Sequence, residues 1–273
     1  MVRELPEAPV YNRVAEWCRR LTQTADCVPL RQLYRGDHWT HALSLPGIAA
    51  ASGFDAELWV ASAGLGLQPV GKSAPSYAAT FSPRHPDSVG QNGEERAQWW
   101  AALQASAGCA TLADLAQRGP VLLAMSEAYT APLGDELVDM ARRGGDTVVI
   151  GGSAGIAATV RLPADAGLRA TLGGTRTSLN VRMAAAWLRN CRDGQLASAN
   201  NLDAWKRWAS NASRVERYDR TAMSDDEVCE FIAKELAADP SVSRTRLLRT
   251  LRDSGRACEQ SRFALLFSQV AAP

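Results

Sequence analysis

An aspartate and two histidines lie close together early in the chain and have side chains suited to acid–base chemistry. The segment RGDHWTH (35–41) holds Asp37, His38 and His41. Asp37 could activate a water molecule, with either histidine assisting. The alternative is a solvated helix start, where an aspartate interacts favourably with the helix dipole. No metal is expected here, because the two histidines are poorly spaced and lack an evident third ligand.

Small polar residues follow three apolar runs, at the points where the predicted strands end. These motifs are Ser62-Ala63-Gly64, Ser126-Glu127-Ala128-Tyr129 and Gly151-Gly152-Ser153-Ala154-Gly155. Backbone N–H groups and hydroxyls in this arrangement suit an anion or a polar heterocycle. Glycines that merely permit tight turns are the alternative. Ligands of open parallel sheets bind at the carboxyl ends of strands, so the three loops are predicted to converge on one pocket with Tyr77.

Familiar nucleotide-binding and hydrolase motifs are absent from these loops. The sequence has no phosphate-binding loop ending in Gly-Lys-Ser/Thr and no dinucleotide-binding glycine pattern after a strand. The segment GGSAG (151–155) is formally close to the nucleophile elbow of α/β hydrolases. That fold needs a later histidine, and none follows His85.

The elements that must position these residues alternate between strands and helices. Short apolar runs predict strands at 57–62, 120–126 and 146–152, with 167–174 as a candidate fourth strand. Helices are predicted at 94–106, 110–118 and 130–143. The continuous apolar character of the strands indicates burial on both faces. We therefore expect an α/β fold with an open, mostly parallel sheet flanked by helices.

After residue 175 the pattern changes to helices alone. They are predicted at 178–191, 203–209, 224–237 and 243–254, and Ser224 with Glu227 forms a capping box. Residues 1–175 are thus expected to form an α/β domain. Residues 176–273 are expected to form a small, all-helical C-terminal domain.

Positive charge gathers in the last segment. Residues 1–175 carry 14 Lys/Arg against 17 Asp/Glu, whereas residues 176–273 carry 16 against 12. Residues 243–267 read as two helices joined at Gly255, a pattern compatible with a helix-turn-helix. We expect Arg244, Arg246, Arg249 and Arg252 to contact DNA phosphates, the alternative being a solvated helix face.

Composition excludes several classes of protein. The chain has 273 residues, 46% of them hydrophobic and 22% charged, which is typical of a globular protein and not of a disordered one. Its six cysteines are spread without a metal-binding pair, so we expect reduced thiols, no metal and no cofactor. No apolar run is long enough to span a membrane, and the first residues lack a signal-peptide core. We expect a cytoplasmic monomer without membrane contact.

A pattern between residues 30 and 150 resembles the family of YaaA-like proteins. The matching residues begin at Tyr34, continue through the strand end SAGLGL (62–67) and the segment PSY (75–77), and finish with Ser126 and Tyr129. The resemblance implies a fold like that of the uracil-DNA glycosylase superfamily, related also to a domain of archaeal tRNA-guanine transglycosylases. It implies nucleic acid, double- or single-stranded DNA, as the partner.

Two functions are compatible with this resemblance. The first is a DNA glycosylase that excises a modified or damaged base, in repair or in antiviral defence. The second is a non-catalytic nucleic-acid-binding stress or defence protein of the same fold, and a hydrolase of nucleotide metabolism is a more distant third. In a glycosylase, Asp37 would be the catalytic carboxylate and Glu127 its rival. The base pocket would comprise Tyr34, Ser62, Gly64, Tyr77, Ser126, Tyr129 and Ser153.

Overall fold

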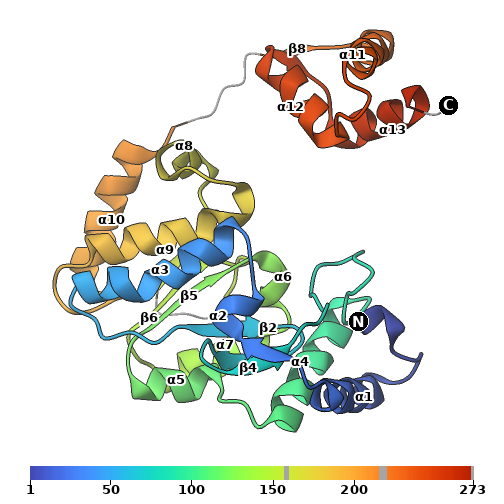
Figure 1. Ribbon diagram of the computed structural model, residues 1–273. Helices are drawn as coiled ribbons and strands as arrows, with labels where there is room; N and C mark the ends of the chain where they lie inside the picture. The colour runs from blue at the N-terminus through green and yellow to red at the C-terminus, as the bar shows by residue number, and fades with distance from the viewer. Residues whose placement is uncertain (157–159, 215–219, 272–273) are drawn as a thin grey trace. The chain divides into compact units, whose positions relative to one another are not determined.

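The computed structural model describes residues 1–156, 160–214 and 220–271. The chain divides into an N-terminal unit, Met1–Arg214, and a C-terminal unit, Val215–Pro273 (Figure 1). This division falls later than the boundary expected at residue 175. The reason is that α9 (Leu179–Asn190) and α10 (Ala199–Ala212) pack into the apolar core of the N-terminal unit.

A three-stranded parallel sheet lies at the centre of the N-terminal unit. Its strand order is β5 (Val121–Met125), β6 (Thr147–Gly151) and β7 (Val160–Leu162). The helices α6 (Glu127–Thr130) and α7 (Gly134–Arg143) connect β5 to β6. Every residue of β6 is buried, as expected for a central strand covered on both faces. The α/β class and the strands predicted at 120–126 and 146–152 are confirmed.

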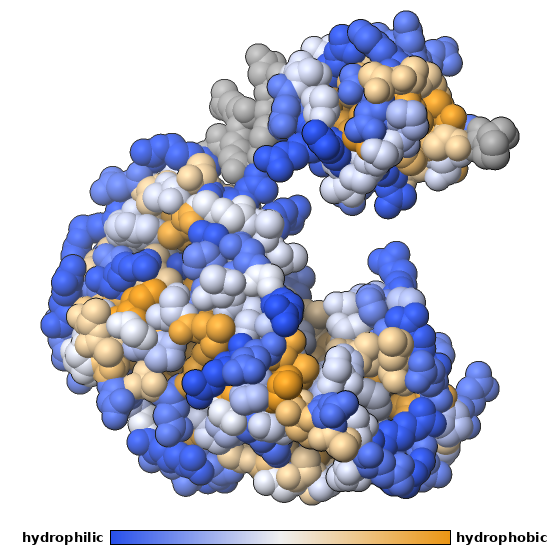
Figure 2. Space-filling model, in the orientation of Figure 1, coloured by the Kyte–Doolittle hydropathy of each residue, from blue (hydrophilic) through white to orange (hydrophobic). Residues whose placement is uncertain are grey.

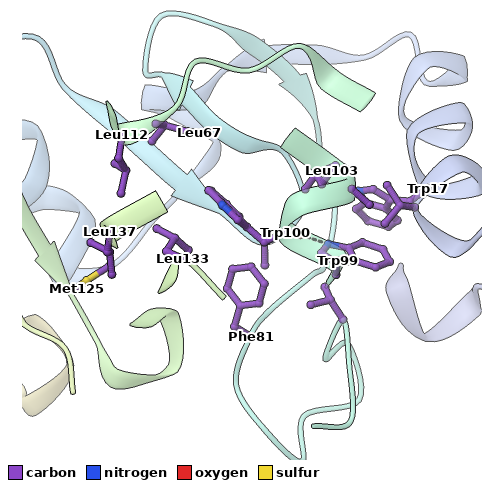
Figure 3. Packing of buried hydrophobic residues seen from close by; sticks show 14 of the residues in the cluster. Trp17, Leu67, Phe81, Trp99, Trp100, Leu103, Leu112, Met125, Leu133 and Leu137 are labelled. Atoms are coloured by element: carbon purple, nitrogen blue, oxygen red, sulfur yellow. Dashed lines mark hydrogen bonds between the residues drawn. The ribbon is translucent and has the colours of Figure 1, made fainter. Parts of the chain in front are cut away.

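Helices cover both faces of the sheet. Val148 and Ile150 of β6 join the apolar cluster that includes α9 and α3 (Asp37–Ala51), whereas Val149 joins the opposite cluster. This alternation follows from the two-residue period of a strand. The second cluster involves α1 (Val10–Gln23), α4 (Gly93–Ala107), α5 (Leu112–Arg118) and α7. Figure 3 shows its aromatic part, in which Phe81 lies beside Trp100.

The strand expected at 57–62 belongs to a hairpin and not to the parallel sheet. The strand β2 (Trp59–Ser62) pairs antiparallel with β3 (Gly66–Pro69). The chain reverses between them, and Gly66 adopts a φ of +73°, which other residues rarely tolerate. A second antiparallel pair joins β1 (Cys27–Pro29) to β4 (Ser73–Pro75). The region 64–92 therefore holds two short strands where a loop was expected.

The candidate fourth strand at 167–174 is wrong. This segment forms a short 3₁₀ turn, η2 (Ala166–Leu168), followed by α8 (Arg169–Leu172). Leu168 and Leu172 are four residues apart, and both contact the same apolar cluster, which suits helical spacing. The remaining short elements of this unit are η1 (Val2–Glu4), α2 (Leu30–Leu33) and η3 (Arg176–Ser178).

The C-terminal unit has a core of its own. It contains α11 (Asp225–Ala238), α12 (Arg244–Asp253) and α13 (Gln260–Val270), whose apolar side chains form one cluster around Phe263. A two-residue parallel pair, β8 (Thr221–Ala222) with β9 (Arg256–Ala257), adds to the expected helices. The capping box of Ser224 and Glu227 is confirmed by its reciprocal hydrogen bonds.

Surface and thiol chemistry agree with the composition. Figure 2 shows hydrophilic residues over much of the visible face of each unit. Within the described ranges, no helix has both the length and the apolar character needed to cross a membrane. All six cysteines carry free thiols.

Candidate functional site

Two tyrosines and a serine form a chain of hydroxyl groups in the N-terminal unit. The hydroxyls of Tyr34 and Tyr77 lie 2.5 Å apart, and that of Tyr77 also bonds the Ser62 hydroxyl. Ser62 in turn accepts a hydrogen bond from the backbone N–H of Gly64 at 3.1 Å. Because Ser62 is buried and already bonded on both sides, it positions Tyr77. The residues at the end of β2 are thus joined to α2 through Tyr34.

Gly64 allows the ring of Tyr77 to approach the backbone closely. A side-chain carbon added at Gly64 would overlap the Tyr77 ring. Trp17 of α1 packs edge-on against the same ring, with ring centroids 6.1 Å apart, and its indole N–H donates to the Gly64 carbonyl at 2.7 Å. The Tyr77 ring is therefore in contact with both the strand end and α1.

Replacing Gly64 with alanine is expected to displace Tyr77 and to lower the free energy of unfolding by about 1–3 kcal/mol, the usual range for overpacking. Gly71→Ala is the matched control, because an added carbon there meets no atom within 4 Å. Urea unfolding of both variants measures the difference. Equal stability of the two variants would show that the Tyr77 ring is not held in this way.

Burial keeps the hydroxyls of Tyr77 and Tyr129 protonated. It raises the pKa of Tyr77 well above the ordinary value, and it raises the pKa of Tyr129 to about 12. Tyr129 packs edge-on against Phe81, with ring centroids 5.0 Å apart. Tyr77 and Tyr129 both pack against the same apolar cluster. Neutral phenols in this cluster can donate hydrogen bonds to a polar ligand.

Asp37 is held as an ionised carboxylate at the start of α3. Gly36, with a φ of +100°, leads the chain into the helix. The Ser178 hydroxyl and the Arg182 guanidinium hold the pKa of Asp37 at about 2. Arg182 donates to the carboxylate at 2.8 Å, and His41 Nε2 lies 3.4 Å from it. The Asp37 side chain remains 39% exposed, so water can reach it.

The first turns of α9 link Asp37 to the carboxyl ends of the parallel strands. Arg182 contacts Asp37, while Asn180 donates from its amide to the Met125 carbonyl at the end of β5, at 2.7 Å. The backbone N–H of Gly152, just after β6, donates to the same carbonyl at 3.0 Å. Asp37 and the loops after β5 and β6 are therefore braced by one helix.

The structure brings together part of the predicted pocket. Tyr34, Ser62, Gly64 and Tyr77 are in contact, and Tyr129 packs against the same apolar cluster as Tyr77. The other predicted residues lie at the carboxyl ends of β5 and β6. Ser126 and Glu127 begin α6 and are exposed, and the backbone N–H of Ser153 donates to the Thr130 hydroxyl. Among the described residues, no hydrogen bond joins the side chains of Ser126, Glu127 or Ser153 to the tyrosines.

Three residues of this site escaped the sequence analysis, namely Ser178, Asn180 and Arg182. They fall in the segment that was assigned to the helical domain. The signal available was the polar run TRTS (175–178), which follows two glycines and precedes a helix. Such a run is typical of a helix N-terminus placed against another element.

The predicted DNA-binding arginines differ in their surroundings. Arg244 and Arg246 are exposed and form no ion pair within the part of the chain that is described. Arg249 is also exposed, with a long contact of 3.7 Å to Asp253. Arg252 instead donates to the Cys258 carbonyl at 3.3 Å and braces the turn after α12. Three of the four side chains are thus available to an anionic partner.

No group of three or more metal-ligating side chains gathers anywhere in residues 1–156, 160–214 and 220–271. No protein-family model, curated protein or solved structure matches the chain.

Proposed function

We propose that this protein binds DNA and hydrolyses the N-glycosidic bond of a modified or damaged base. The observation that carries the proposal is Asp37, an ionised yet water-accessible carboxylate that is linked through α9 to the carboxyl edge of a parallel sheet. Hydrolysis of this bond passes through a sugar with oxocarbenium character, which a carboxylate stabilises while orienting water. The resemblance of residues 30–150 to YaaA-like proteins supports the same reaction.

The site residues have distinct parts in this reaction. The target nucleotide leaves the stack, and its base enters the region of Tyr34, Tyr77 and Tyr129. Water adds to the sugar carbon as the bond to the base nitrogen breaks, and the base leaves with a proton. Tyr34, half-buried at one end of the hydroxyl chain, and the exposed Ser126 hydrogen-bond the base. The exposed arginines of α12 bind backbone phosphates.

A second function is favoured by one specific observation. Asp37 is neutralised by direct contact with Arg182, and such a pair is also what a purely structural aspartate makes. The alternative is a non-catalytic DNA-binding protein of the same fold. It predicts base recognition without release.

The test is to detect the released base. Wild-type protein is incubated with single- and double-stranded DNAs that contain different modified bases, and free bases are quantified by mass spectrometry. We expect the wild-type protein to release one of these bases, and the Asp37→Asn variant to release none. Binding to these DNAs without release of any base would overturn the catalytic proposal in favour of the alternative.

A further inference from the structure

A groove of about 460 Å³ lies between the later parts of α3 and α9. Ser44, Gly47, Ile48 and Ser52 line it from the α3 side, and Arg189 and Arg192 line it from the other. The proposed reaction centre does not include these residues. This groove is chemically suited to an oxyanion, because two guanidinium groups and two serine hydroxyls line it and Gly47 adds no side chain.

The groove is aligned with the candidate site. Asp37 contacts Arg182 near the starts of the two helices, and residues 44–52 meet Arg189 and Arg192 near their ends. The helices therefore run in the same direction. Seven residues separate Asp37 from Ser44, which corresponds to about 10 Å along a helix. A DNA strand advances roughly 3.4 Å per nucleotide along the duplex axis, so this spacing corresponds to about three nucleotides.

Gly47 keeps the floor of the groove open. It lies in the interior of α3, where glycine is less favourable than alanine. A side-chain carbon built at Gly47 meets no atom within 4 Å, so packing does not require glycine here. Its φ is also not in the left-handed region. What glycine provides at this position is space in front of the two arginines.

The guanidinium groups of Arg189 and Arg192 form no hydrogen bond or ion pair with any residue that the structure describes. Among residues 1–156, 160–214 and 220–271, neither takes part in an ion pair, and both side chains are exposed. Guanidinium groups bind phosphate oxygens with two parallel hydrogen bonds, a geometry that a lysine lacks. The remaining structural explanation is a favourable interaction of both arginines with the C-terminal end of α9.

We propose that this groove binds a backbone phosphate of the DNA strand whose target base lies at Asp37. The proposal rests on the proposed function for its ligand. It makes the seam between α3 and α9 a path for the phosphodiester chain within the N-terminal unit.

The test measures binding of a fluorescein-labelled single-stranded oligonucleotide as a function of salt. In the full-length Arg189→Ala/Arg192→Ala variant, affinity is expected to fall about tenfold, as befits the loss of charged hydrogen bonds. The slope of log affinity against log salt should become shallower by about 0.7, the value for one phosphate on a single strand. Arg207→Ala, which removes an exposed arginine of α10 outside the groove, is the matched control and should change neither quantity.

A steric variant tests the groove with both arginines present. Gly47→Leu should fill the floor and reproduce the loss of affinity, whereas Gly47→Ala should keep most of the affinity and raise the melting temperature. If the arginines only stabilise the end of α9, the double variant will unfold more easily but bind DNA with unchanged affinity and slope. That result would overturn the proposal.

Inorganic phosphate distinguishes the source of the anion. If phosphate protects the wild type but not the double variant against thermal unfolding, while oligonucleotide binding is unchanged in the variant, the ligand is a free phosphate compound and the strand path is refuted. These binding measurements do not depend on turnover. Failure of base release would therefore remove the proposed function without removing a measured change in salt slope.

Discussion

Asp37→Asn is expected to lower the rate of base release by about 10² or more while leaving DNA affinity near that of the wild type. The amide preserves the shape of the side chain and its contact with Arg182, but it removes the negative charge that would stabilise the sugar cation. Single-turnover release under saturating protein measures the effect on chemistry alone.

Glu127→Gln is the matched variant, because Glu127 is an exposed carboxylate directly after β5. It should retain wild-type release. If Glu127→Gln loses release and Asp37→Asn keeps it, the catalytic role belongs to Glu127. Full release by both variants would contradict a carboxylate mechanism altogether.

The pH profile gives an independent check on Asp37. Its pKa in the folded protein is about 2, below the ordinary value of 3.8, so the ionised form persists as pH falls from neutral. The contribution of this carboxylate is fully present above its unfolded pKa and is lost as pH falls through about 2. Release should therefore show no decline due to Asp37 between pH 5 and pH 8. A group with a pKa near 6 controlling release would assign that role to another residue.

Replacing Arg244, Arg246 and Arg249 together with alanine is expected to weaken DNA binding by about two orders of magnitude at all sequences. Each lost phosphate contact should reduce the slope of log affinity against log salt by about 0.9 on duplex DNA. The matched control replaces the same three residues with lysine, which keeps the charge and should keep most of the slope. An unchanged slope in the alanine variant would assign these arginines to an ordinary solvated surface.

Two of the three parallel strands, β5 and β6, could be predicted from the sequence because each is a short, continuous apolar run between helices. The third strand, β7, was not predicted: it has only three residues, and one of them is Arg161. The hairpin at β2 could not, since an apolar run does not specify which strand it pairs with. For α9, the spacing of Met183 and Trp187 predicts a helix but not the surface against which it packs. Only the folded chain shows that this surface is the parallel sheet and α3.

The candidate site was predictable to a similar degree. Tyr34, Ser62 and Tyr77 follow from the resemblance and are in contact, although they lie up to 43 residues apart in the chain. Arg182 could not be linked to Asp37, because 145 residues separate them and no local pattern records the pair. That pair determines the charge state of Asp37, so its electrostatics could be worked out only from the structure.

The most direct test of base excision is a strand-break assay. Its substrate is an oligonucleotide that contains the base identified in the release experiment. Alkali cleaves DNA at abasic sites, so each excision event becomes a shorter fragment. Wild-type protein in excess should yield fragments, Asp37→Asn should yield none within the same time, and the Arg244/Arg246/Arg249 alanine variant should yield them once its concentration saturates binding. Absence of fragments with wild-type protein, on DNA that it demonstrably binds through the N-terminal unit, would contradict base excision as the function of this protein.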